Sequence, residues 1–158
     1  MGYKLAIDFG MTNSVIAQWD ETSVSGRTLD VPLLSASTSA GEFLIPTLLY
    51  VRNGQTGEIV MGAAVRAQNL DHQMDNRLFR NFKRTLKKEA VFDARLIDGA
   101  PWTEAQARQI FLQRLLESLP YRAEDIDQLV VTVPVAAFEE YTNWLSEAAE
   151  GIDRKSVV

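Results

Sequence analysis

Residues 5–17 of this chain, LAIDFGMTNSVIA, place one carboxylate and a polar turn between two apolar runs. The apolar residues before Asp8 and after Asn13 are mostly branched, which is typical of two buried strands joined as a hairpin. We therefore expect strands at residues 3–7 and 14–19. The rest of the chain can be arranged around the link between them.

The link between these strands carries groups suited to an anion. Gly10 lets backbone N–H groups approach a ligand closely, and several N–H groups in one concavity form an anion site. Thr12, Asn13 and Ser14 add side-chain donors. Asp8 would repel phosphate, but it can hold the water shell of a magnesium ion that bridges phosphate oxygens. An ordinary hairpin turn with polar residues is the alternative interpretation.

Composition narrows the class of protein. The 158 residues, 46% of them hydrophobic, suit one globular domain. The formal net charge of -5 argues against a nucleic-acid partner, and no apolar run reaches the roughly 18 residues that span a membrane. The lack of cysteine excludes disulfides and thiolate metal sites, and the single His72 has no second histidine for a zinc site. We expect a cytoplasmic protein with no membrane partner.

The first half of the chain predicts a series of strands. Residues 21–26 predict a loop, and residues 28–34 predict a strand at a sheet edge because they contain Pro32. Residues 45–51 and 58–62 predict a second hairpin that turns at Asn53 and Gly54.

The second half predicts helices around one further strand. Residues 63–68 and 103–116 predict helices, the second capped by Thr103, and residues 138–149 predict a third. Residues 77–88 hold six basic residues over apolar residues at helical spacing, so they predict a helix with a solvated face or one lysine that reaches a phosphate. Residues 128–134 predict a strand covered on both faces. This order indicates an α/β fold with a mixed sheet, flanking helices and ligand chemistry at the strand ends.

The segment DFGMTNS at residues 8–14 resembles the first phosphate motif of the actin-like ATPases, and its form is closest to DnaK-type heat-shock chaperones of the seventy-kilodalton class. Four further segments resemble motifs of that family in the family's order: IPT at 45–47, VMGAA at 60–64, FKR at 82–84 and VTVP at 131–134. The resemblance covers nearly the whole chain.

The resemblance implies lobe I of an actin-like ATPase domain, a ribonuclease H-like fold that binds ATP or ADP with Mg²⁺. Residues 1–37 and 106–158 would form a base subdomain, and residues 38–105 would form an inserted small α+β subdomain. A complete parent protein would hydrolyse ATP and act on unfolded polypeptide clients with co-chaperones. The 158-residue chain stops before the family's second phosphate loop and adenosine motif, so we expect little or no ATPase activity from it.

The resemblance also assigns roles to single residues. Asp8 would bind magnesium through water, and Lys83 would be the catalytic residue that positions the attacking water at the γ-phosphate. A compact cation suits that role because it offsets the charge that develops on the phosphate. The phosphate cradle would be formed by the backbone of four residues, Gly10, Met11, Thr12 and Asn13.

The chain departs from the family pattern in three places. Met11 stands where the family usually has the first of two threonines, so a hydroxyl near the γ-phosphate is missing. Thr142 stands in place of an arginine that relays the nucleotide state, and Ala136 and Ala137 replace an aromatic pair. Two alternatives therefore stay open: a divergent actin-like binding module with a degenerate nucleotide site, or the N-terminal part of an actin-like sugar or acetate kinase. The kinases share the first motif but match less well at Lys83 and at residues 131–134.

Overall fold

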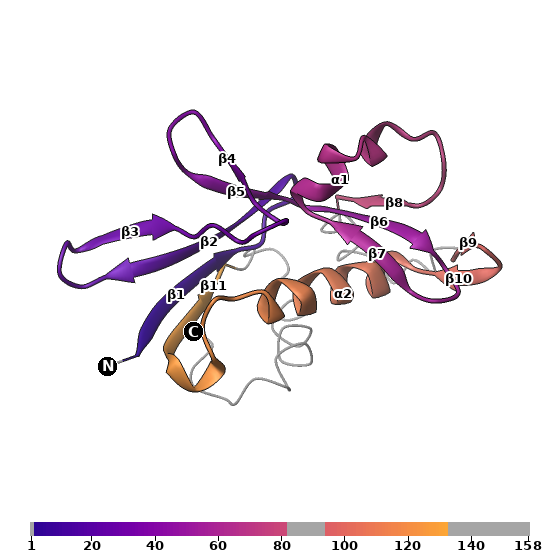
Figure 1. Ribbon diagram of the computed structural model, residues 1–158. Coiled ribbons are helices and arrows are strands. Elements are labelled where there is room, and N and C mark those ends of the chain that lie inside the picture. The colour runs from indigo at the N-terminus through magenta and orange to yellow at the C-terminus, as the bar shows by residue number, and fades with distance from the viewer. Residues whose placement is uncertain (1, 82–93, 133–158) are drawn as a thin grey trace.

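The computed structural model describes residues 2–81 and 94–132, which form a mixed α/β chain with several sheets and few helices (Figure 1). The strands are β1 (Tyr3–Asp8), β2 (Asn13–Asp20), β3 (Ser25–Thr28), β4 (Ala36–Ser37), β5 (Phe43–Pro46), β6 (Leu48–Asn53), β7 (Glu58–Met61), β8 (Leu78–Arg80), β9 (Arg95–Ile97), β10 (Ala100–Trp102) and β11 (Ile126–Val131). The α-helices are α1 (Ala63–Ala67) and α2 (Glu104–Glu117), and short 3-10 helices occur at Leu70–His72 and Ala123–Asp125.

The larger sheet has six strands, in the order β11-β1-β2-β5-β4, and β3 also pairs with β2. β1 and β2 form the predicted hairpin, in which Ala6 faces Ala17 and Asp8 faces Val15. On the other side of β1, β11 runs parallel to it, with Ile7 beside Val131. The predicted mixed sheet is therefore confirmed, and the carboxyl ends of β1 and β11 meet at one edge.

A separate, smaller antiparallel sheet has three strands, in the order β7-β6-β8. β6 and β7 are the predicted second hairpin, and α1 follows it as predicted. The small hairpin of β9 and β10 is joined to this sheet by Arg77, which donates to both carboxylate oxygens of Asp98 at 2.5 and 2.9 Å. Asp98 also accepts the Gly54 N–H at 2.9 Å. The Arg77 hydrogen bond is the largest cause that lowers the pKa of Asp98 from 3.8 to about 2.

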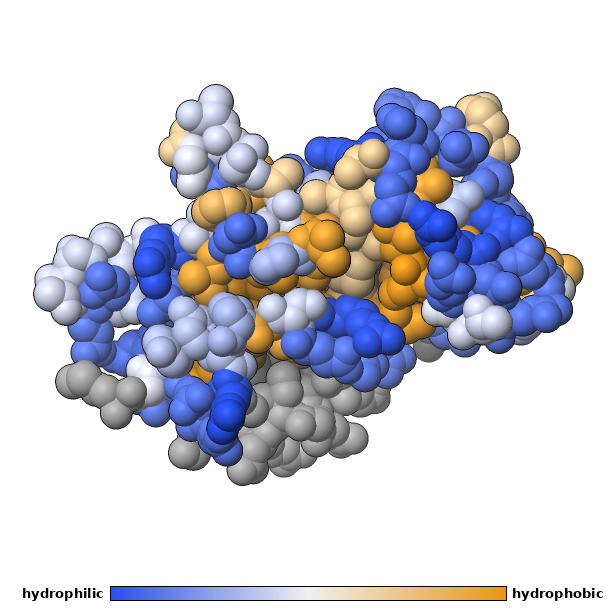
Figure 2. Space-filling view, viewed as in Figure 1, coloured by the Kyte–Doolittle hydropathy of each residue, from blue (hydrophilic) through white to orange (hydrophobic). Residues whose placement is uncertain are grey.

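Helix α2 runs beneath both sheets and closes the core (Figure 1). The Thr103 hydroxyl accepts the Gln106 N–H and the Gln106 side chain accepts the Thr103 N–H, so the predicted cap is present as a full capping box. Phe111 and Leu115 are fully buried and belong to the same apolar cluster as Ile7 and Ile97. Apolar residues gather in the middle of the face drawn in Figure 2, where the sheets and α2 meet.

The predicted strand at residues 28–34 is wrong. The pairing with β2 ends with the Leu29 N–H, which donates to the Ile16 carbonyl at 2.8 Å. The backbone then turns, with the Leu34 N–H donating to the Val31 carbonyl at 3.0 Å. Leu33 adopts a left-handed φ of 70°, which lies outside the β region of regular strands. Leu29, Val31 and Leu34 are nevertheless buried, so the apolar pattern comes from a turn that packs into the core. The strand next to β2 begins earlier, at Ser25, inside the predicted loop.

The predicted helix at residues 77–88 is also wrong over its first part, where Leu78–Arg80 form β8 against β6. Phe79 is fully buried between a half-buried Leu78 and an exposed Arg80, which is the alternation of a strand. The remainder of that prediction, from residue 82 to 88, lies outside the described residues, as does the predicted helix at 138–149. No described helix has the length and apolar character to cross a membrane.

Two further strand predictions are modified. The predicted strand at residues 45–51 is split at Thr47 into β5, which joins the larger sheet, and β6, which joins the smaller one. The predicted strand at residues 128–134 is observed as β11, but its side chains are mostly half-buried, and only Val131 is buried. Thr47 is therefore the single residue that connects the larger sheet, at β5, to the smaller sheet, at β6.

Candidate functional site

Four residues, 9–12, link β1 to β2. Continuing the observed register of Asp8 with Val15 places Gly10 opposite Asn13, so that Met11 and Thr12 form the tip. A Cβ atom at residue 10 would lie 2.0 Å from the Asn13 carbonyl oxygen, which only glycine avoids. Phe9 anchors the turn because it is fully buried, with its ring centroid 5.8 Å from that of Phe111 on α2.

Thr47 holds this turn from the side of the second sheet. Its backbone N–H donates to the Thr12 carbonyl at 2.9 Å, and its hydroxyl donates to the Gly10 carbonyl at 3.0 Å. The Ser14 hydroxyl lies 3.0 Å from the Thr47 hydroxyl, and both residues are almost fully buried. Ser14 therefore faces the protein interior, and its predicted role as a ligand donor is wrong.

The contacts of Thr47 decide which way the turn's backbone donors face. In a trans peptide the carbonyl and the following N–H point in opposite directions, and the described residues contain no cis peptide bond. The Gly10 carbonyl points at Thr47, so the Met11 N–H points away from it. Met11 and Thr12 are both exposed, and Asn13 is half-buried. The predicted cradle residues thus lie together at one accessible tip.

Asp8 lies at the carboxyl end of β1, beside the turn, and its side chain is exposed. The Thr132 hydroxyl, one residue past the end of β11, donates to the Asp8 carboxylate at 2.5 Å. The Thr132 N–H also donates to the Ile7 carbonyl at 2.9 Å, which extends the parallel pairing beyond β11. Thr132 therefore orients the carboxylate at the edge where the two parallel strands end, the position at which open α/β sheets bind ligands.

The donor set limits how a metal could bind here. Within residues 2–81 and 94–132, no group of three or more His, Cys, Asp or Glu side chains could hold a metal ion. Mg²⁺ keeps several of its waters and commonly binds through one or two carboxylates together with substrate phosphates. A single exposed carboxylate next to backbone donors fits that mode and does not fit a metal cage built from protein ligands.

Sequence reasoning named Asp8 and residues 10–13 as candidates, but it did not name the two hydroxyl residues that contact them, Thr47 and Thr132. Thr47 and Thr132 belong to two of the segments that resemble family motifs, although no role was expected for either. Lys83 lies outside the described residues, and so do Ala136, Ala137 and Thr142. The expectation that Asp8 and Lys83 act on the same nucleotide phosphates therefore stays a prediction.

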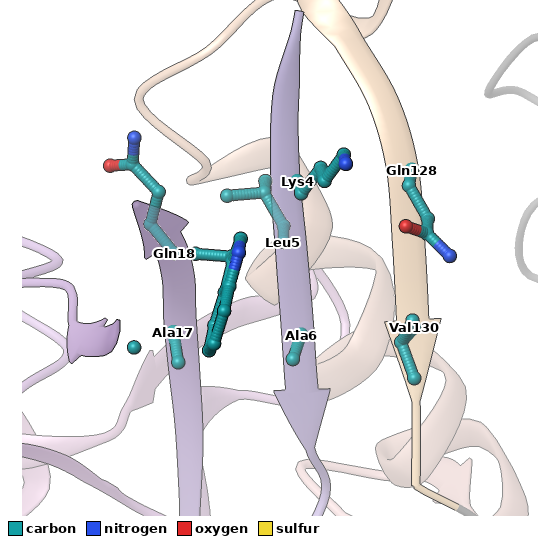
Figure 3. A pocket seen from close by; sticks show the side chains of 9 residues that line it. Lys4, Leu5, Ala6, Ala17, Gln18, Gln128 and Val130 are labelled. Atoms are coloured by element: carbon teal, nitrogen blue, oxygen red, sulfur yellow. The ribbon is translucent and has the colours of Figure 1, made fainter. Parts of the chain in front are cut away.

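An open pocket of about 400 Å³ lies on the larger sheet (Figure 3). Ala6, Ala17 and Val130 lie level on neighbouring strands, and their short side chains leave the hollow beside the half-exposed Trp19. Lys4 at its rim pairs with Glu21 at 2.5 Å, which raises the pKa of Lys4. None of the predicted site residues lines this pocket.

No protein-family model matches this sequence, and a search of the curated proteins finds no significant match.

Proposed function

We propose that this chain binds the phosphates of ATP or ADP, with Mg²⁺, at the turn of residues 10–13 and Asp8. The observation that carries the proposal is the Thr132–Asp8 hydrogen bond, which fixes a carboxylate beside a backbone turn at the ends of two parallel strands. Backbone N–H groups suit phosphate oxygens, and a water-mediated carboxylate suits the magnesium ion that neutralises them. Together they provide one side of a nucleotide-phosphate site.

The parent domain that we propose is lobe I of a DnaK-type, actin-like ATPase. The support is the resemblance of five segments in order, together with a sheet in which an antiparallel unit of β1, β2 and β3 is followed by the parallel β11. In that proposal Lys83 positions the attacking water, and the parent acts in the cytoplasm on unfolded polypeptides with co-chaperones. Phosphoryl transfer needs groups on all sides of the phosphate, so weak binding and little turnover are expected of the 158 residues.

A second candidate function is nucleotide binding without hydrolysis. Met11 occupies the tip of the turn with 42% of its surface exposed, where a threonine would offer a hydroxyl. A thioether is only a weak acceptor and donates no hydrogen bond. The turn can then hold phosphate by its backbone while lacking one group near the terminal phosphoryl.

The proposal is tested by titrating the chain with Mg–ATP and following backbone amide signals by NMR. We expect shifts concentrated at residues 10–13 and at Thr132, and smaller shifts when magnesium is withheld. Signals at these residues that do not move at millimolar Mg–ATP would refute the proposed site. Tight binding by this chain would contradict the expectation that it supplies only one side of the phosphate site.

The two candidate functions are separated by turnover in a longer parent chain. ATP hydrolysis that Lys83→Ala abolishes, with little loss of folding, supports the ATPase. Binding of Mg–ATP by the parent without turnover supports the binding module.

A further inference from the structure

We propose that Thr47 is a positioning residue that fixes the orientation of the 10–13 turn for phosphate binding. This inference rests on the proposed function and adds a residue that does not itself touch the ligand. Thr47 has 1% of its surface exposed, so it acts through the backbone of the turn.

Thr47 makes two hydrogen bonds to the turn from one residue. The backbone N–H holds the Thr12 carbonyl and the hydroxyl holds the Gly10 carbonyl, at 2.9 and 3.0 Å. These carbonyls flank the tip, so both ends of the two-residue tip, Met11 and Thr12, are held. Either peptide could otherwise rotate and direct a carbonyl oxygen, instead of an N–H group, toward the anion.

The Gly10 carbonyl determines the direction of the Thr47 hydroxyl proton, and with it the donor in the contact with Ser14. The Gly10 carbonyl can only accept, so the single Thr47 hydroxyl proton points to it. The Ser14 hydroxyl, 3.0 Å away, must then donate to the Thr47 oxygen. The chain of donors therefore runs from Ser14 through Thr47 to Gly10 and satisfies each of these buried groups.

The position of Thr47 in the fold makes this contact rigid. β5 ends at Pro46 in the larger sheet and β6 begins at Leu48 in the smaller one, so the residue between them is held on both sides by strand pairing. Because Thr47 is almost fully buried and Gly10 is half-buried, water competes less for the hydroxyl bond than it would at the exposed tip. The Met11 N–H is consequently held facing away from the core before any ligand arrives.

The experiment compares 158-residue chains that carry Thr47→Val, Thr47→Ser or Ser14→Ala. Valine keeps the shape and removes the hydroxyl, serine keeps the hydroxyl, and Ser14→Ala leaves the bond from Thr47 to Gly10 in place. NMR relaxation of the Met11, Thr12 and Asn13 amides measures the order of the turn without ligand, and Mg–ATP titration measures affinity. We expect Thr47→Val to lose turn order and to bind roughly tenfold more weakly, with the other two close to wild type.

The outcomes separate this inference from the function on which it depends. A wild-type chain with no Mg–ATP response at residues 10–13 overturns the proposed function, and the positioning role with it. Equal turn order or equal affinity in wild type and Thr47→Val overturns the positioning role and leaves the function standing. Equal losses in Ser14→Ala and Thr47→Val show a general effect of disturbing the buried pair and also overturn it. If Thr47→Val does not fold, Thr47→Cys, a weaker donor, takes its place with the same criteria.

Discussion

The hydroxyl of Thr132 donates a 2.5 Å hydrogen bond to the carboxylate of Asp8, across 124 residues of sequence. The contact exists because β11 inserts beside β1 in parallel, so that both strands end at one edge of the sheet. It gives the exposed carboxylate one orientation next to the 10–13 turn. The candidate site is therefore held from two sides, by Thr132 at Asp8 and by Thr47 at the turn.

Replacing Asp8 with asparagine should weaken Mg–ATP binding roughly tenfold, whereas binding of ATP without magnesium should not weaken, because the Asp8 carboxylate repels phosphate when no metal ion lies between them. The asparagine oxygen still accepts from Thr132, so the local structure is retained and one negative charge is removed. Calorimetry or NMR titration with and without magnesium measures the difference. Asp20→Asn, the same change at the far end of β2, is the control and should bind like wild type. An Asp8→Asn chain that keeps the full magnesium effect would exclude Asp8 from the metal site.

Replacing Gly10 with alanine should lower the free energy of unfolding by about 1–3 kcal/mol. The new Cβ would meet the Asn13 carbonyl oxygen at 2.0 Å, and this backbone atom can move only if the hairpin opens. Urea unfolding followed by circular dichroism measures the change. Gly26→Ala is the matched control, because a Cβ atom there would lie 4.0 Å from the Gln18 carbonyl oxygen, which is ordinary van der Waals contact. Equal stability of the two variants would show that the tip tolerates a side chain.

The ion pair of Arg77 with Asp98 should make the free energy of unfolding depend on pH in the acid range. The pKa of Asp98 in the folded chain is about 2, below its ordinary value of 3.8. The ionised carboxylate therefore stabilises the folded state at pH values above 3.8. That stabilisation is lost as the pH falls through this window toward 2. Unfolding midpoints of wild type and Asp98→Asn should converge as the pH falls through it.

Arg77→Met tests the cause of that acid dependence. It removes the larger cause of the lowered pKa and leaves the hydrogen bond from the Gly54 N–H, so part of the acid dependence should remain. If the difference in unfolding midpoint between wild type and Asp98→Asn does not change with pH, Asp98 has the same pKa in the folded and the unfolded chain.

Replacing Thr103 with alanine should lower the free energy of unfolding by about 1 kcal/mol. The substitution removes the acceptor for the Gln106 N–H at the start of α2, and this helix carries Phe111 and Leu115 into the core. Thr103→Ser keeps the hydroxyl and should remain near wild type. Thermal unfolding of the two variants measures the difference, and equal losses would attribute the effect to the methyl group and not to the cap.

Local patterns predicted those elements whose stabilising contacts lie close in sequence. The β1–β2 and β6–β7 hairpins each pair segments joined by a short turn, and α2 has its cap three residues from the group it binds. The same patterns were wrong at residues 28–34 and 78–80. Residues 29–34 form a turn whose apolar side chains are buried in the core, and residues 78–80 pair with β6. Both outcomes depend on contacts with residues that are distant in sequence.

The amino-acid order was enough to select Asp8 and the 10–13 turn, because a carboxylate, a glycine and polar residues between two apolar runs form one local unit. The tertiary structure decided which residues orient this unit. Thr47 and Thr132 reach the turn only because β5 pairs with β2 and β11 pairs with β1. Such pairings depend on the packing of the whole sheet and helix α2, whose contacts join residues that are far apart in the chain.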